Sequence, residues 1–163
     1  MRDFDPRYVL FERLKVGSGR TRGYRMADET TLDQLRRRGD VIWENHRYGA
    51  RYVVDRPFLA QQLSAAVPVV HLGQRPAVAA VTTAVPDASW WVVYLWCPRD
   101  VAERRIVARH TGDTDARLRA WDDTEPLPDA DLTIDTAEVS PHAAAERIHR
   151  HVLADGRSTV PHA

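Results

Sequence analysis

Residues 90–96, Trp90-Trp91-Val92-Val93-Tyr94-Leu95-Trp96, form an apolar run of the length of one β-strand. Such a run predicts a strand that is buried on both faces, as in the centre of a parallel sheet. A helix is expected directly after it, over residues 98–109, because Pro98 stands at its start and apolar residues recur at helical spacing. A strand followed by a helix is the repeating unit of α/β folds.

The same alternation of strands and helices extends along the chain. Strands are predicted over residues 8–16, 41–43, 51–54, 67–72 and 132–135, and helices over residues 28–38, 58–65, 74–83, 115–121 and 141–153. This order predicts an α/β domain with a mostly parallel sheet and helices on both of its faces. Ligands of such sheets gather at the carboxyl ends of the strands, which places residues 17–25, 73–75, 97–99 and 135–140 on one rim.

Composition limits the classes of protein to which the chain can belong. Its 163 residues are 44% hydrophobic and carry no net charge, which predicts one soluble domain over residues 1–153 and a flexible tail over residues 154–163. The neutral balance argues against nucleic-acid binding, and no segment has the length of a membrane span. The single cysteine, Cys97, excludes a disulfide framework, so a cytoplasmic location is expected.

Arginine makes up all but one of the 23 basic residues, the exception being Lys15. Its planar guanidinium matches two phosphate oxygens, so arginines that converge from different elements favour phosphate recognition. Six arginines are candidates: Arg20, Arg22, Arg25, Arg105, Arg109 and Arg117. The alternative is an ordinary solvated surface in which arginine replaces lysine, the interpretation preferred for Arg36, Arg37 and Arg38 at a helix end.

Three short segments contain arginine or tyrosine side chains suited to phosphate: Arg20 with Arg22, Tyr24-Arg25-Met26-Ala27-Asp28, and Tyr48-Gly49. In this order they resemble the guanylate-kinase-like family of nucleoside monophosphate kinases, where they are similar to its Thr-Thr-Arg segment, its Asp-Tyr-x-Phe-Val-Ser segment and its Tyr-Gly pair. Residues 39–44 are similar to Gly-Glu-Phe-Leu-Glu-Trp with altered register. Residues 105–109 followed by Arg117-Leu118 resemble the lid's arginine motif. Residues 69–75, which end at Arg75, are closer to the bacterial ribose 1,5-bisphosphate phosphokinases.

This resemblance implies a three-layer P-loop-kinase fold with an acceptor-binding insert at about residues 20–55 and a lid at about residues 109–117. The implied ligand is a small phosphorylated acceptor, a nucleoside monophosphate or a phosphosugar. The residues implied to bind it are Arg20, Arg22, Tyr24, Glu44, Tyr48 and Arg75. Arg105, Arg109 and Arg117 would neutralise the migrating phosphoryl group, with ATP and Mg²⁺ as donor and cofactor. Glu44 can equally pair with a neighbouring arginine.

The donor-binding part that the resemblance implies has no counterpart in the sequence. A Gly-x-x-x-x-Gly-Lys-Ser/Thr loop and the strand before it are expected upstream of Asp5, where only four residues stand. Either about 20 to 25 residues precede Met1, the length of one strand, loop and helical turn, or the sheet closes by pairing with another chain, as in a homodimer. The sequence therefore leaves two functions open: an ATP-dependent kinase, or a non-catalytic module that binds a phosphorylated ligand or serves as a scaffold.

Overall fold

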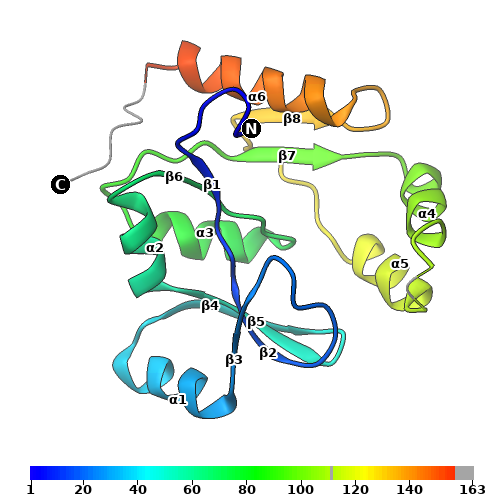
Figure 1. Ribbon diagram of the computed structural model, residues 1–163. Helices are drawn as coiled ribbons and strands as arrows, with labels where there is room; N and C mark the ends of the chain where they lie inside the picture. Colours follow the sequence, from blue (N-terminus) through cyan, green and yellow to red (C-terminus); the bar gives the residue numbers. More distant parts are fainter. Residues whose placement is uncertain (111, 157–163) are drawn as a thin grey trace. The chain divides into compact units, whose positions relative to one another are not determined.

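A computed structural model describes residues 1–110 and 112–156 (Figure 1). The chain divides into two compact units. As far as they are described, the N-terminal unit holds residues 2–72 and 76–88, and the C-terminal unit holds residues 73–75 and 89–156 together with Met1. Residues 157–163 of the predicted tail lie outside the described residues, as does Thr111 of the predicted lid.

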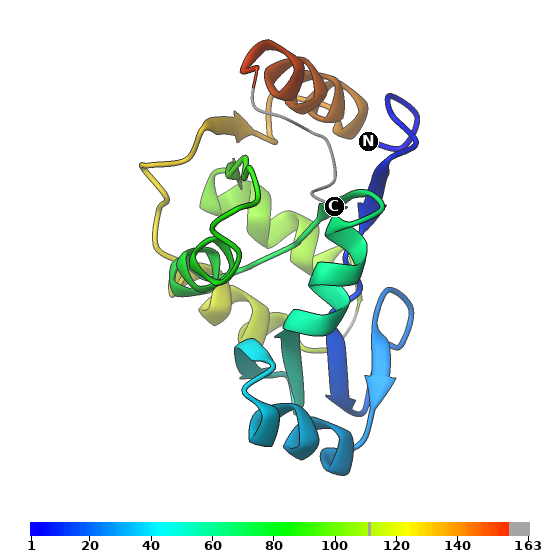
Figure 2. The same cartoon turned by 90° about the vertical axis from the view of Figure 1, so that its left-hand side faces the viewer.

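The N-terminal unit contains a four-stranded sheet in the order β3-β2-β5-β4 (Figure 2). Its strands are β2 (Leu14–Gly17), β3 (Arg25–Ala27), β4 (Val41–Arg47) and β5 (Ala50–Asp55). β2 pairs in parallel with β3, whereas the β2–β5 and β4–β5 pairs are antiparallel. α1 (Glu29–Arg38) covers this sheet through a core of Leu14, Val16, Leu32, Leu35 and Val53. Because β2 and β3 run in parallel, the connection between them leaves β2 at Gly17 and returns along the sheet to Arg25, which lies opposite Leu14 at the start of β2.

The bounds of α1 follow from its caps, as the sequence predicts. The Asp28 carboxylate accepts a hydrogen bond from the Thr31 amide at 2.8 Å, which satisfies one of the free N–H groups at the helix start. Gly39 ends the helix with φ of +70°, a conformation that glycine adopts without the strain of a side chain. The prediction of a helix over residues 28–38 is confirmed, with Asp28 as its cap.

A second sheet of the N-terminal unit joins β1 (Tyr8–Leu10) and β6 (Val67–Val69) in parallel. α2 (Arg56–Leu63) follows β5, and α3 (Arg75–Ala84) follows β6. The prediction of one strand over residues 8–16 is wrong, because the chain changes sheets within it. The Phe11 amide still donates to Val69 O at 3.0 Å, whereas Arg13 O already accepts from the Arg25 amide at 3.1 Å. The predicted strand over residues 67–72 is likewise shorter, and β3 was not predicted.

The C-terminal unit contains the parallel pair β7 (Val93–Trp96) and β8 (Leu132–Asp135). Its helices are α4 (Arg99–Val107), α5 (Thr114–Asp122) and α6 (Pro141–Ala154). Ile134 of β8 and Ala144 of α6 belong to its core, with Val93 and Leu132 packed against it. The predicted strand over residues 90–96 begins only at Val93, since the Val92 amide donates to the Asp131 carboxylate at 2.7 Å instead of to a neighbouring strand.

Parallel pairing is thus present in two short two-stranded sheets, while the four-stranded sheet is mixed. The mixed α/β character agrees with the expectation from the sequence, and the three-layer arrangement stays a prediction. Within the described part of the chain, no helix combines the length and the apolar character that a membrane span needs.

Candidate functional site

The connection between β2 and β3, residues 18–24, carries the first three candidate residues: Arg20, Arg22 and Tyr24. Gly17 leads into it with φ of +124°, and a Cβ built there would lie 2.9 Å from Cα of Ala50. A side chain at position 17 would therefore meet the backbone of β5. Glycine lets β2 and β5 approach at the point where the loop leaves the sheet. We call residues 18–24 the β2–β3 loop.

Lys15 of β2 contacts this loop directly. Its Nζ donates a hydrogen bond to the carbonyl oxygen of Arg20 at 2.8 Å, and only 2% of the residue is exposed. The same ammonium lies 5.5 Å from the ring centre of Tyr24 and 5.7 Å from that of Tyr52. These are distances at which a cation is attracted to the face of an aromatic ring. Lys15 therefore joins β2, the loop and β5 at one point.

Arg13 lies on the same two rings. Its guanidinium carbon is 5.9 Å from the ring centre of Tyr24 and 5.1 Å from that of Tyr52, and the two rings are tilted against each other at 5.3 Å. Desolvation by the surrounding protein lowers the pKa of His71, and repulsion from Arg13 lowers that pKa further. The lowered pKa favours the neutral form of His71, so the positive charge of this region comes mainly from the arginines and Lys15.

Within the described residues, the cations around the loop share the absence of an acidic partner. Among the described residues, none of Arg13, Lys15, Arg20 and Arg22 has a carboxylate within ion-pair distance. Their neighbour Arg25 pairs with Asp55. Like charges gathered without counter-charge repel one another, so this group, which we call the loop cation cluster, favours an anionic ligand.

Arg20 and Arg22 are exposed on the loop, where Nε of Arg20 donates to Arg22 O at 3.1 Å. As far as the described residues go, most of the donors of both guanidinium groups have no partner and can bind a ligand. The ring of Tyr24 packs on Tyr52, while its hydroxyl makes no hydrogen bond within the described residues. The structure therefore brings three of the six predicted acceptor residues together with Arg13 and Lys15.

Tyr48 lies at the turn between β4 and β5 and is 44% exposed. Its φ is +51° and that of Gly49 is +71°, so a tyrosine occupies a left-handed position that Asn, Asp or Gly normally takes in a hairpin turn. A bulky residue in such a conformation is unfavourable for the turn itself, which favours a role for the exposed ring.

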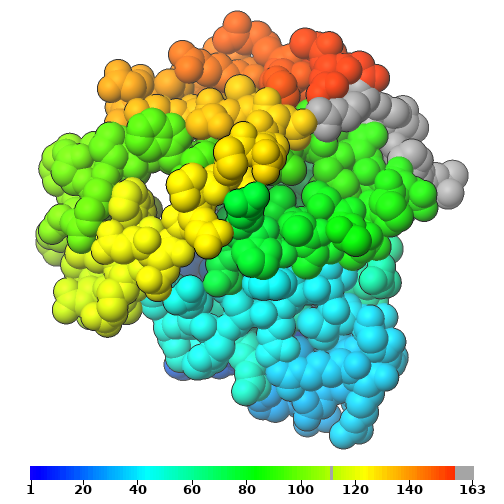
Figure 3. Space-filling view, turned by 180° about the vertical axis from the view of Figure 1, so that it is seen from behind, coloured from blue at the N-terminus to red at the C-terminus, as the bar shows by residue number. Residues whose placement is uncertain are grey.

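Glu44 of β4 is held by arginines of its own unit. Its carboxylate accepts two hydrogen bonds from Arg36, at 2.6 and 3.1 Å, and lies 3.6 Å from Nε of Arg51. The helix that contains Arg36, α1, is visible in light blue in the space-filling view of Figure 3. The sequence left open whether Glu44 binds the ligand or pairs with a neighbouring arginine, and the structure shows the pair with Arg36.

The other candidates belong to the C-terminal unit. Arg75 pairs with Asp129 at 3.3 Å, and Arg117 pairs with Asp113 at 2.6 Å. Arg105 donates to the hydroxyl of Thr136 at 2.9 Å and to its carbonyl oxygen at 2.6 Å. Arg109 is exposed at the end of α4 and has no acidic partner among the described residues. The lid arginines are thus mostly engaged within their own unit.

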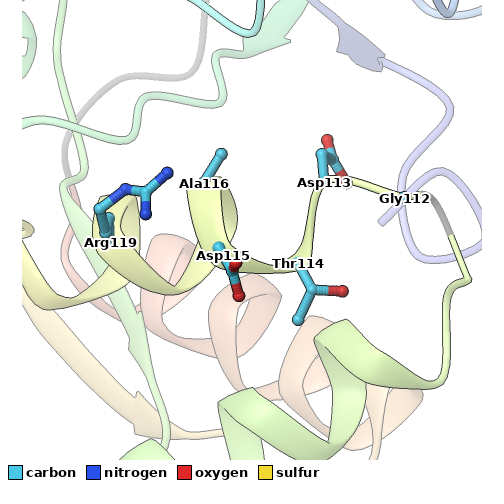
Figure 4. Close-up of a pocket in the computed structure, with 6 residues that line it drawn as sticks. All are labelled: Gly112, Asp113, Thr114, Asp115, Ala116 and Arg119. Carbon is cyan, nitrogen blue, oxygen red and sulfur yellow. The ribbon is translucent and has the colours of Figure 1, made fainter.

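A hollow of about 280 Å³ lies at the start of α5 in the C-terminal unit (Figure 4). It is lined by Gly112, Asp113, Thr114, Asp115, Ala116 and Arg119. Two of these six residues are aspartates against a single arginine, so the lining carries an excess of negative charge that disfavours a phosphate. We therefore place the candidate anion site at the β2–β3 loop and not in this hollow. In the described part of the chain, no three His, Cys, Asp or Glu side chains gather as metal ligands.

Arg13 and Lys15 were not among the residues predicted for the site. Both were placed inside a strand, where a charged side chain is ordinarily solvated on one face. The signal for Lys15 is that it stands between Leu14 and Val16, which are also buried, and opposite Tyr52 in the β2–β5 register. The sequence alone does not show that β2 pairs with β5, and it is this pairing that brings Lys15 next to Tyr52.

Comparison with known proteins identifies the fold. The structure is similar to the crystal structure of guanylate kinase from Anaplasma phagocytophilum, with a TM-score of 0.66 and 14% sequence identity. The match covers 98% of this chain and 82% of that chain. No family model matches the sequence, and no curated protein matches it. The chain therefore has a guanylate-kinase-like fold, a mixed α/β fold found in a kinase.

Proposed function

We propose that this chain is a guanylate-kinase-like phosphotransferase domain that binds a small phosphorylated acceptor, a nucleoside monophosphate or a phosphosugar, at the β2–β3 loop. Arg20, Arg22 and the hydroxyl of Tyr24 contact the phosphate, and Tyr48 contributes from the β4–β5 turn. The observation that carries the proposal is the loop cation cluster, which gathers positive charge without carboxylate partners. A phosphate dianion supplies the missing counter-charge and accepts hydrogen bonds from several donors at once.

The proposed chemistry of transfer is positioning and charge stabilisation, with no covalent intermediate. Arg105, Arg109 and Arg117 are proposed to neutralise the migrating phosphoryl group, after Arg105 and Arg117 release their present partners in the C-terminal unit. ATP with Mg²⁺ is the proposed donor only where a Gly-x-x-x-x-Gly-Lys-Ser/Thr loop is part of the protein. The only lysine of this sequence, Lys15, is buried in β2 and is not available for that task.

A non-catalytic binding module is the second candidate. The observation in its favour is that same lysine, since the 163 residues contain no second one that can contact the donor phosphates. Both candidates share the acceptor site, and they differ in whether donor phosphates are bound.

Isothermal titration calorimetry with matched ligand pairs tests the shared acceptor site. We expect GMP to bind at least about tenfold more tightly than guanosine, and ribose 5-phosphate more tightly than ribose, since one charge-assisted hydrogen bond is worth about 1.5 kcal/mol or more. Equal affinities within each pair would contradict the proposal. A heat of binding in the same titration with Mg-ATP would show that these 163 residues bind donor phosphates and would favour the kinase over the non-catalytic module.

A further inference from the structure

The burial of the Lys15 ammonium group is not explained by the proposed function alone. It is one of the largest fully buried side chains of the chain, and Leu14 and Val16 beside it are buried as well. Taking an ammonium group out of water costs several kcal/mol unless it finds partners. Within the described residues Lys15 has no carboxylate partner, so an ion pair does not account for its burial.

The partners that Lys15 does have all direct it towards the β2–β3 loop. Its one hydrogen bond in the described part of the chain is to the carbonyl oxygen of Arg20, at 2.8 Å. Tyr52, its neighbour in the β2–β5 register, and Tyr24, at the end of the loop, present their rings to the ammonium. The ammonium is therefore fixed between strand and loop by one bond and two rings.

Arg20 itself belongs to the exposed part of the loop. Its backbone carbonyl is held by Lys15, whereas its side chain extends from the same residue and bonds to Arg22 O. Fixing the carbonyl of Arg20 thus restricts the backbone from which both guanidinium groups extend. A loop held in this way loses less conformational entropy when it binds a ligand than a free loop does.

From these contacts we infer that Lys15 is the positioning residue of the anion site, an inference that rests on the proposed function. Its ammonium holds the β2–β3 loop through Arg20 O and so presents Arg20 and Arg22 to the phosphate. Lys15 acts through the loop and not as a donor-phosphate ligand. Its charge adds to the positive potential at the site, which favours a phosphate monoester over a neutral ligand.

The replacement Lys15→Met tests this role, because methionine keeps an unbranched apolar stem of similar length and removes the ammonium. The ¹⁵N order parameters of the amides of residues 18–22, measured by nuclear magnetic resonance without ligand, are expected to fall below about 0.6, since the loop is then no longer held through Arg20 O. The affinity for GMP is expected to fall about tenfold, the value of one charge-assisted hydrogen bond. Lys15→Arg keeps a cation and a donor and should restore part of both values.

Arg13→Met is the matched control for loop order. Among the described residues, the Arg13 side chain lies on the same two rings but makes no hydrogen bond to the loop, so its loss removes an equal charge and leaves the order parameters of residues 18–22 unchanged. Unchanged order parameters in Lys15→Met, or an equal fall in Arg13→Met, would overturn the inference. Absence of GMP binding by the wild-type chain would instead reject the proposed function, while the order parameters would still report on Lys15.

A second measurement serves if Lys15→Met does not fold. Because Lys15 is the only lysine, an amine-reactive ester labels only this side chain and the N-terminal amine of the wild-type chain. Labelling of buried Lys15 requires the loop to open, so saturating GMP is expected to slow it at least about tenfold while the N-terminal amine reacts at its former rate. An unchanged labelling rate of Lys15 under saturating GMP would overturn the inference.

Discussion

Replacing Asp55 with alanine is expected to lower the free energy of unfolding by about 3 kcal/mol. Asp55 is 3% exposed and has two roles in the N-terminal unit. Its carboxylate caps α2 by accepting from the Phe58 amide at 3.1 Å, and it pairs with Arg25 of β3. Loss of the cap costs about 1 kcal/mol, and the remainder comes from leaving a partly buried arginine unpaired.

Arg25 makes this effect larger than that of an ordinary surface ion pair. Its guanidinium lies 3.8 Å from the ring centre of Phe58, and its Nε donates to Glu12 O at 2.9 Å. Without Asp55, the positive charge of Arg25 stays partly buried and has no carboxylate to balance it. Urea denaturation followed by circular dichroism measures the change.

Asp33→Ala is the control for Asp55→Ala. Asp33 pairs with Arg36 on the exposed face of α1, and half of its side chain is accessible, so its loss should cost less than about 1 kcal/mol. Equal losses of stability in the two variants would show that Asp55 contributes no more to the free energy of unfolding than the exposed Asp33 does.

The second large effect is expected for the double replacement Arg20→Gln/Arg22→Gln. We expect it to weaken GMP binding at least about a hundredfold, because two charge-assisted hydrogen bonds of about 1.5 kcal/mol each are lost. Both side chains are exposed and neither pairs with a carboxylate among the described residues, so the stability of the fold should change by less than about 0.5 kcal/mol. Calorimetric titration and thermal unfolding of the same samples separate the two effects.

The double replacement Arg2→Gln/Arg37→Gln is the matched control for net charge. It removes the same two charges from exposed arginines of the N-terminal unit that lie outside the loop. If the affinity depends only on overall charge, both double variants lose it equally. The proposal requires that the loop variant loses it and that the control keeps it within about twofold.

The ends of helices, and a strand bounded by turns, are the features of this structure that the sequence predicts well. Asp28 and Gly39 fix the two ends of α1, and Pro141 with Ser140 begins α6 at the predicted residue. Each of these signals acts within a few residues of the backbone group that it satisfies. The prediction of β8 over residues 132–135 is confirmed for a similar reason, since its run of strand formers is bounded by turns.

Which segments far apart along the chain pair with each other could not be predicted from the sequence. The chain changes sheets between Phe11 and Leu14 because Phe11 bonds to Val69, 58 positions further along the chain, and no local pattern marks that partner. β3 is too short to show a period, and it exists through its register with β2. The burial of Lys15 follows from the same pairing, as does its contact with Tyr52.

In the candidate site, too, residues of one local segment could be predicted, whereas residues brought in by the pairing of distant strands could not. Arg20, Arg22 and Tyr24 could be named from their order along the chain, since they lie on one loop. Arg13 and Lys15 join them only through ring contacts that the β2–β5 pairing creates. Conversely, Glu44 and Arg75 had the residue types of ligand contacts, and the structure places both in ion pairs.

Nuclear magnetic resonance of the ¹⁵N-labelled chain during a titration with GMP tests the central claim most directly. The account predicts that the largest changes in amide chemical shift fall on residues 17–25, with smaller ones at Tyr48 and Gly49, and that guanosine alone leaves residues 17–25 unaffected. Largest changes at residues 112–119, around the hollow at the start of α5, would contradict it.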